Sequence, residues 1–177
     1  MKKLLLPCLL FACLSASAQD TFKTDDGLTY RITSEKTVEV SDADYDITSF
    51  NVPATVENEG VTYTVTAIGE DAFYYTDATS VTLPETIERI EYGGFMSCPI
   101  TSIELPSGLK YIGGYAFSST DLTEITIPAS VVEIGDDAFF TCYSLASITF
   151  NEGLKKLGGS IFYKCPLVNV TLPESLE

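Results

Sequence analysis

Apolar and polar positions repeat along the second half of the chain at a nearly constant step. The hexapeptide at 68–73, IGEDAF, returns as IGDDAF at 134–139, and related stretches stand at 90–95, 112–117 and 157–162. The Phe that ends each stretch recurs every 22 or 23 residues: Phe73, Phe95, Phe117, Phe139 and Phe162. A fixed period of about 20–50 residues is the signature of a solenoid, because a single repeat cannot bury its own apolar face. The Phe column is expected to stack in the core of this coil.

Each repeat also carries the pattern of one short strand. Apolar and polar residues alternate after every column Phe, which predicts a strand with one buried face; the apolar pairs are 81/83, 103/105, 125/127, 148/150 and 170/172. A further apolar pair at three-residue spacing, such as Ile87/Ile90, predicts a tight 3₁₀-like or irregular return. Glycine then predicts a corner that a residue with a Cβ would strain; the residues are Gly69, Gly113, Gly135 and Gly158.

Residues 19–64 precede the repeat and are predicted to form an N-terminal β cap over the open end of the solenoid, which takes up 65–177. Alternating segments predict strands at 27–33, 36–40, 50–56 and 61–68, with a hairpin loop at 57–60. At the other end the sequence stops just past a rung. Either it is a truncated product, or a partner surface covers that end, so end-to-end self-association is one expected outcome.

Residues 1–18 have the features of a secretory signal peptide: two lysines, an apolar run and a small-residue site ending at Ala18. Cleavage after Ala18 is the favoured interpretation, and a lipoprotein cut that leaves Cys13 acylated is the alternative. The segment is too short to span a membrane, and no other apolar segment reaches that length. The sequence therefore predicts a secreted or cell-surface protein without a membrane-spanning segment.

The charge balance narrows the class of partner. The chain has 10 Lys and Arg against 25 Asp and Glu, a formal charge of −15, and losing residues 1–18 removes Lys2 and Lys3 and no acid, which leaves −17. A surface this acidic repels phosphate backbones, so nucleic-acid binding is excluded as a function. It suits a solvated secreted protein or partners that carry basic patches.

Candidate chemistry is sparse because the chain has no His. Ser/His and Cys/His catalysis are therefore excluded, and we expect no enzyme, no cofactor and no metal site. The acidic turn Asp42–Asp46 resembles the opening of a calcium loop, but Ile47 stands where Gly is needed and Pro53 where Glu is needed.

Three cysteines stand three residues after a column Phe, where the other repeats have Thr: Cys98, Cys142 and Cys165. Two interpretations stay open for them. They are small buried residues of one column, or a disulfide joins adjacent rungs.

The combination IG-x-x-AF, then Cys three residues on, then L-x-S-I-T resembles the BspA-like leucine-rich repeats. It is clearest in IGDDAFFTCYSLASITF at 134–150, and TYTVTAIGEDAF at 62–73 is similar to the entry into that family's first repeat. The resemblance implies a mainly β, right-handed leucine-rich-repeat solenoid of about five rungs of 22–23 residues with an N-terminal β cap. Members of the family are bacterial surface and secreted proteins, Bacteroidetes among their sources, implicated in adhesion to matrix and plasma proteins and to neighbouring cells.

The outward strand positions are the candidate binding face, because short polar side chains in register can present a flat surface to a partner. Two hypotheses remain: an exported adhesion or protein-binding module, and a structural spacer without a specific ligand. A glycan-binding module lacks the expected aromatic platform on these columns. The residues of the candidate face are Ser80, Thr82, Ser102, Glu104, Glu124, Thr126, Ser147, Thr149, Asn169 and Thr171.

Overall fold

Strands and turns, with no helix, make up residues 20–177, the part of the chain that the computed structural model describes. The predicted signal peptide at 1–18 lies outside these residues. Among them no helix is long and apolar enough to cross a membrane. The strands are β1 (Thr21–Lys23), β2 (Leu28–Ile32), β3 (Thr37–Ala43), β4 (Ser49–Asn51), β5 (Thr55–Asn58), β6 (Val61–Ile68), β7 (Ser80–Thr82), β8 (Arg89–Ile90), β9 (Tyr111–Ile112), β10 (Glu124–Ile127), β11 (Glu133–Ile134), β12 (Ser147–Phe150) and β13 (Lys156–Leu157).

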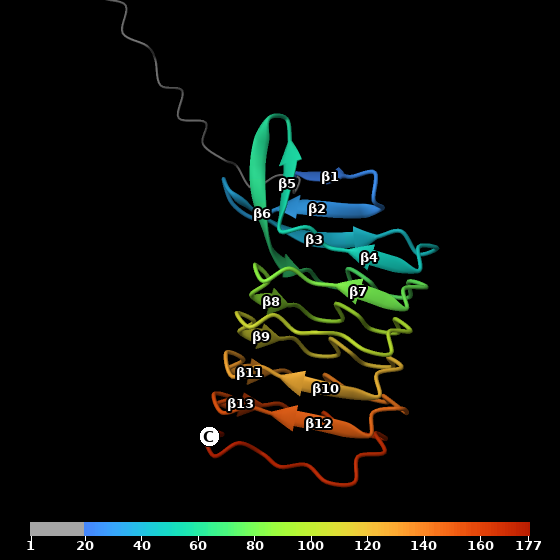
Figure 1. Ribbon diagram of the computed structural model, residues 1–177, viewed down its shortest axis with the longest axis vertical. Coiled ribbons are helices and arrows are strands. Elements are labelled where there is room, and N and C mark those ends of the chain that lie inside the picture. Colours follow the sequence, from blue (N-terminus) through green and yellow to red (C-terminus); the bar gives the residue numbers. More distant parts are fainter. Residues whose placement is uncertain (1–19) are drawn as a thin grey trace, which may run out of the picture.

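The strands stack into a β-solenoid of about five turns, as the repeat period predicts (Figure 1). One sheet follows the order β1-β2-β3-β6-β8-β9-β11-β13, with β5 also paired to β6. Two smaller sheets, β4-β7 and β10-β12, lie on another side of the coil. The leucine-rich-repeat solenoid expected from the sequence is therefore confirmed.

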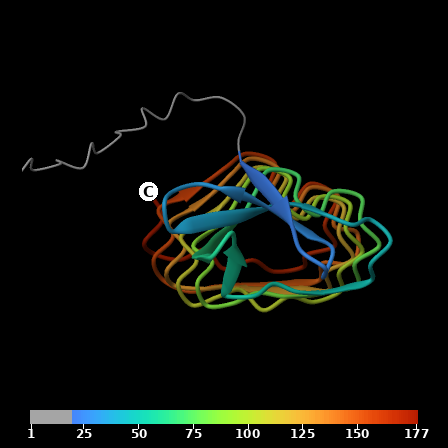
Figure 2. The same cartoon turned by 90° about the horizontal axis from the view of Figure 1, so that it is seen from above.

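The N-terminal strands β1, β2 and β3 pair antiparallel and lie across the first coil of the stack (Figure 2). β3 then pairs parallel with β6, so this segment continues directly into the solenoid sheet. Buried residues of both parts, among them Tyr30, Val40 and Ile68, belong to one hydrophobic core. Its role as a cap, with a boundary after residue 64, stays a prediction; β6 runs across that boundary.

The predicted strands around 27–33, 36–40 and 61–68 are confirmed, but the single strand expected at 50–56 is wrong. The chain leaves β4 after Asn51 and begins β5 at Thr55, with Pro53 between them. Proline has no N–H for a ladder, so it separates the two strands. β5 and β6 form the expected hairpin, whose two-residue loop places Glu59 and Gly60 at φ of 50° and 77°.

The expected 3₁₀-like or irregular return is found in its first half, where single turns are closed by hydrogen bonds three residues apart, such as the Ile87 N–H to the Pro84 C=O at 3.2 Å. What the sequence did not predict is the two-residue strands that follow, β8, β9, β11 and β13, which pair in parallel register. Each rung brings the two residues at these matching positions to the same place in the coil, so the backbone N–H and C=O groups of neighbouring rungs meet. The column Ile90, Ile112 and Ile134 is buried beneath this ladder.

The Phe column forms the predicted aromatic spine. Phe73, Phe95, Phe117 and Phe139 are fully buried. Their ring centroids lie 5.0, 5.4 and 5.4 Å apart from one rung to the next, with interplanar angles of 14°, 10° and 5°. Phe162 continues the stack at 6.1 Å. Because each ring fills the same position in its coil, the hexapeptide around it has to recur.

The glycine column excludes a Cβ, as expected, but not through a left-handed backbone. Gly69, Gly113, Gly135 and Gly158 do not have positive φ. They allow close approach instead: a Cβ on Gly113 would lie 2.6 Å from the backbone of Glu91 in the preceding rung. The left-handed conformation falls on two later columns, which are Asp71, Gly93, Tyr115, Asp137 and Ser160, and then Tyr75, Ser97, Ser119, Thr141 and Lys164.

Candidate binding face

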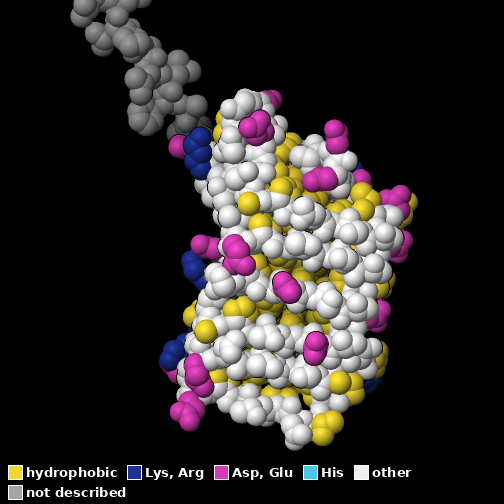
Figure 3. All heavy atoms as spheres, in the orientation of Figure 1, with side chains coloured by type: hydrophobic (Ala, Val, Ile, Leu, Met, Phe, Trp, Pro, Cys, Tyr) yellow, Lys and Arg dark blue, Asp and Glu magenta, His cyan; other side chains and the backbone are white. Residues whose placement is uncertain are grey.

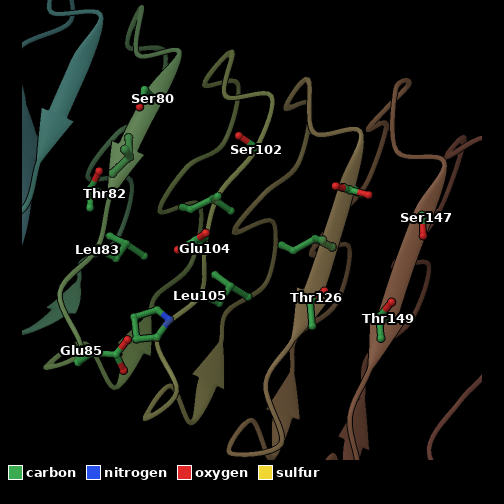
Figure 4. A pocket seen from close by; sticks show the side chains of 15 residues that line it. Ser80, Thr82, Leu83, Glu85, Ser102, Glu104, Leu105, Thr126, Ser147 and Thr149 are labelled. Carbon is green, nitrogen blue, oxygen red and sulfur yellow. The ribbon is translucent and has the colours of Figure 1, made fainter.

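The ten side chains of the candidate binding face are all exposed. Eight of them line one groove over β7, β10 and the rung between these strands (Figure 4). Asn169 and Thr171, in the last rung, do not line it. The eight are Ser80, Thr82, Ser102, Glu104, Glu124, Thr126, Ser147 and Thr149. We call this hollow the strand-face groove.

The strand-face groove lies where the strand ladder is interrupted. β7 pairs with β4, and β10 pairs with β12, but residues 101–106 form no strand. A single backbone hydrogen bond, from the Thr123 N–H to the Thr101 C=O, joins this rung to the next on this side. The strands expected at 103/105 and 170/172 are therefore wrong.

A proline distinguishes the two rungs that lack a strand. In these two rungs alone Pro follows the column cysteine: Pro99 after Cys98 and Pro166 after Cys165. At the matching position of another rung, Asp77 donates its backbone N–H to the Tyr45 C=O at 2.7 Å. Proline has no N–H to donate. Asp121 and Tyr143, at the matching position of the rungs that form β10 and β12, donate no backbone hydrogen bond among the described residues either. The proline therefore marks these two rungs and does not by itself explain the missing strand.

The groove combines an apolar floor with polar walls. Its volume is about 620 Å³, and the half-buried side chains of Leu83, Ile103 and Leu105 form part of its lining. Sequence reasoning assigned these three to the core, because it assumed an unbroken ladder. Figure 3 shows hydrophobic side chains between polar ones on this face. Such a mixed surface can bury apolar side chains of a partner while hydroxyls fix its orientation.

The charged side chains that line the groove are all acidic. Glu85, Glu104 and Glu124 are among its lining residues, and no Lys or Arg is. Glu85 is partly engaged, since its Oε2 accepts hydrogen bonds from the Ser107 N–H at 3.0 Å and the Ser107 hydroxyl at 2.7 Å. The groove therefore favours an uncharged or basic partner segment.

The cysteine column lies inside the coil and reaches the surface only in its last member. Cys98 and Cys142 are buried, Cys165 is half-buried, and all three are free thiols. The Thr76 hydroxyl lies 3.5 Å from the Cys98 sulfur, and the Thr120 hydroxyl lies 3.4 Å from that of Cys142. Thr and Cys thus share one column, as the first of the two interpretations predicts.

The thiols of the last two rungs influence each other. A hydrogen bond with Cys165 lowers the pKa of Cys142, and the same contact raises the pKa of Cys165. Burial alone acts in the other direction at Cys98, where desolvation raises the pKa of the thiol. None of these groups is accompanied by a base or a second catalytic side chain in the contacts described.

The acidic turn after β3 is engaged with its own neighbours. Asp44 forms an ion pair with Lys23, and its backbone N–H donates to the Gly27 C=O at 2.9 Å. Within residues 20–177 no group of three or more His, Cys, Asp or Glu side chains converges as metal ligands do. That Asp42–Asp46 is only a turn stays a prediction.

Sequence reasoning missed a second hollow, because it searched only the outward strand columns for aromatic residues. Tyr92, Tyr111 and Tyr115 line a groove of about 590 Å³ beside β9, β11 and β13. The signal was present in the sequence as Tyr or Phe close to each column Phe. These rings could be placed together only once the cross-section of the coil was known.

The chain matches a known family of repeat proteins. The model of the BspA type leucine rich repeat region matches residues 66–177, in six copies. The comparison with curated proteins gives no match.

Solved structures of bacterial leucine-rich repeat proteins share the fold. One from Bacteroides ovatus is 31% identical with a TM-score of 0.67, over 88% of this chain and 48% of that protein. One from Bacteroides capillosus is 34% identical with a TM-score of 0.67, over 74% of this chain and 98% of that one. A leucine rich cell surface protein from Faecalibacterium prausnitzii is 22% identical with a TM-score of 0.67, over 92% of this chain and 51% of that protein. At this identity the likeness concerns the fold alone. The chain thus spans about half the length of the first and the third.

Proposed function

This chain belongs to the BspA-type leucine-rich repeat family, and from that premise we propose that it is an exported, non-catalytic module that binds proteins at the bacterial cell surface. The strand-face groove is the proposed contact surface. Its partner is an extracellular protein: a host matrix or plasma protein, or a surface protein of a neighbouring cell.

The observation that carries this proposal is the interrupted ladder of the strand-face groove. Between β7 and β10, the backbone groups of residues 102–105 have no hydrogen-bond partner among the described residues. Unpaired N–H and C=O groups in a hollow can bond to the backbone of an extended partner segment. The half-buried Ile103 and Leu105 offer apolar contact beside them.

Export rests on the sequence of residues 1–18 and is part of the proposal. A lysine pair, an apolar run and the small-residue site before Gln19 are what a secretory signal requires. Lipidation at Cys13 would hold the module at the membrane surface, and cleavage after Ala18 would release it.

A structural spacer is the alternative function. Hydrogen bonds and ion pairs between successive rungs, such as Lys110 with Glu88 at 2.7 Å, favour it because they stiffen the stack. A spacer needs no selective surface. It would bind no partner through the strand-face groove.

One experiment separates the two functions. Wild-type protein lacking residues 1–18 is immobilised and exposed to plasma and matrix extract, and the enriched protein is then purified and its Kd measured. Ser102→Lys puts a long cationic side chain into the centre of the groove, where it fills the hollow and offsets the charge of Glu104 and Glu124, so we expect affinity to fall at least about tenfold. Val132→Lys adds the same charge at an exposed site outside the groove and should bind as the wild type does. No reproducible partner would favour the spacer, and equal affinity of the Ser102→Lys protein would place the contact outside the strand-face groove.

A further inference from the structure

A second surface of the solenoid is built from aromatic rings that continue from rung to rung. The centroids of Tyr92 and Tyr115 lie 5.5 Å apart, those of Tyr115 and Phe140 6.2 Å, and those of Phe140 and Tyr163 4.9 Å. Tyr92 and Tyr163 are 46% and 50% exposed, so part of each ring is open to a partner. This surface lies apart from the strand-face groove, and the two share no lining residue.

A groove borders the upper part of this aromatic ladder, and we call it the tyrosine groove. Glycine keeps its floor low, since Gly114, Gly135 and Gly158 line it without a side chain. Its volume is about 590 Å³, close to that of the strand-face groove. The rings of Tyr92, Tyr111 and Tyr115 form its aromatic lining.

The charged groups of the tyrosine groove are mainly acidic. Glu133, Asp136 and Asp137 line it, against Lys156 as the one cation of the lining. Lys156 is already placed 3.6 Å from Glu133. Asp136 accepts the Gly159 N–H at 2.6 Å through Oδ1, which leaves its Oδ2 without a partner in the described residues. The lining therefore keeps two aspartates in excess over its cations.

The molecule shows how this kind of surface holds a cation. The guanidinium carbon of Arg89 lies 4.2 Å from the centroid of Tyr111, a ring of the same groove. The Arg89 Nε and Nη2 donate to the carboxylate of Glu91 at 2.5 and 3.3 Å. Two rungs further along the solenoid, the Lys164 Nζ lies 5.2 Å from the Tyr163 centroid. A ring face and a nearby carboxylate together attract a cation more than either alone.

We propose that the tyrosine groove binds arginine or lysine side chains presented by an extended basic segment of a partner protein. The ring faces of Tyr92 and Tyr115 would contact the cation, and Asp136 and Asp137 would neutralise it. The formal charge of −15 favours the same class of partner, because it attracts basic segments at a distance.

The test uses two peptides that differ only in charge. The probe is an acetylated and amidated peptide with arginines separated by glycine, and its control carries citrulline, the uncharged near-isostere, in place of each arginine. Binding is followed by NMR and by calorimetry on protein lacking residues 1–18. We expect the arginine peptide to bind at least about tenfold more tightly, with shifts concentrated at Tyr92, Gly114 and Asp136. Raising NaCl from about 50 mM to about 500 mM should weaken it several-fold, since the contacts are exposed.

Matched variants locate the contact. Asp136→Asn with Asp137→Asn removes two charges, keeps an acceptor for Gly159 and suits the positive φ at 137. We expect the affinity for the arginine peptide to fall about two- to fivefold for each charge removed, because the ion pairs are exposed, and by a similar factor in Tyr92→Leu. Asp121→Asn and Tyr143→Leu, exposed and outside both grooves, are the controls and should leave binding unchanged.

Three outcomes would overturn the proposal: equal binding of the citrulline peptide, variants that bind as their controls do, or shifts that fall on the strand-face groove. Binding of a neutral oligosaccharide at the same rings, with none of the arginine peptide, would assign the groove to carbohydrate instead. The two grooves share no lining residue. A negative result with the arginine peptide therefore leaves the Ser102→Lys experiment unaffected, and a negative result with Ser102→Lys leaves the peptide experiment unaffected.

Discussion

Gly135 lies so close to Gly114 of the preceding rung that a Cβ on Gly135 would stand 2.4 Å from the Gly114 backbone nitrogen. Real Cβ atoms do not approach a backbone atom that closely. The contact arises because adjacent rungs stack in register and the chain turns the same corner in each. Space between rungs, and not a left-handed φ, is therefore what selects glycine at this corner.

The first prediction concerns this space. Gly135→Ala should lower the free energy of unfolding by about 1–3 kcal/mol, because backbone on both sides has to shift to admit the methyl group. Urea unfolding followed by circular dichroism measures the change.

Gly108→Ala is the matched control. Its Cβ would meet the Glu85 carbonyl oxygen at 3.6 Å, which is ordinary contact, and Gly108 has no positive φ. We expect it to be neutral or to stabilise the fold by about 0.4–1 kcal/mol, since Ala restricts the unfolded chain. Equal losses at the two positions would mean that the corner is not a close approach.

The sequence predicts the coil because its repeat period is a physical requirement. A Phe has to stand at 95, 117 and 139, since each ring packs on the next. This period can be read from the sequence without coordinates. The reason why position 135 is a glycine could not be read from the sequence, because both a positive φ and a close approach select glycine. The positive φ lies on residues such as Asp71 and Tyr115, which give no such signal.

The candidate site was predicted in part for a related reason. Alternation places Ser80, Thr126 and Ser147 outward, and the structure brings them to one groove. Alternation at 103/105 looks the same as in the other rungs, so the missing strand there was not expected. The tyrosine groove depends on which residues of the corner meet those of the next rung. That depends on the cross-section of the coil, which a single sequence does not specify.

The second prediction concerns the aromatic spine. Phe117 is fully buried, with a stacked ring 5.4 Å away on each side. Phe117→Ala should cost about 3–5 kcal/mol of unfolding free energy, through lost burial and a cavity in the middle of the stack. Tyr143→Ala, at a 67% exposed ring, should cost less than about 0.5 kcal/mol. A loss below about 1 kcal/mol at Phe117 would contradict a continuous spine.

The third prediction concerns the cysteine column. Protein lacking residues 1–18, purified without reductant and then unfolded, should show three free thiols in a quantitative thiol assay. Before unfolding, Cys165 should react first with a bulky maleimide, because Cys98 and Cys142 are buried. Mass spectrometry of the labelled peptides identifies the site. A single free thiol after unfolding would establish the disulfide between adjacent rungs.

The fourth prediction concerns export. Protein secreted by the native pathway should begin at Gln19, since cleavage after Ala18 follows the small-residue site. Intact-mass measurement and N-terminal peptide analysis check this. A diacylglyceryl group on Cys13 would contradict cleavage after Ala18 and would indicate a lipid-anchored protein.

The fifth prediction concerns acid and the last rung. The Glu152 carboxylate accepts the backbone N–H groups of Glu174 and Ser175, each at 3.1 Å. These donors, the Glu174 N–H foremost, lower the pKa of Glu152 below its ordinary value of 4.5. A carboxyl group with a lowered pKa stabilises the fold above its ordinary pKa, and this contribution is lost as the pH falls through the lower, folded-state value. The turn at 174–175 should therefore loosen first on acidification.

Hydrogen-exchange protection factors at about pH 7 and about pH 3.5 test this expectation. Protection at Glu174 and Ser175 should fall relative to that of the Phe117 amide, which donates to the Ala138 C=O inside the stack. Glu152→Gln should weaken the protection at pH 7 and remove most of its dependence on pH, since an uncharged amide is the poorer acceptor. Glu174→Gln, at a side chain that accepts no hydrogen bond from residues 20–177, should keep the wild-type profile. Protection at 174–175 that follows the Phe117 amide across the whole range would show that packing, and not the Glu152 carboxylate, holds this turn.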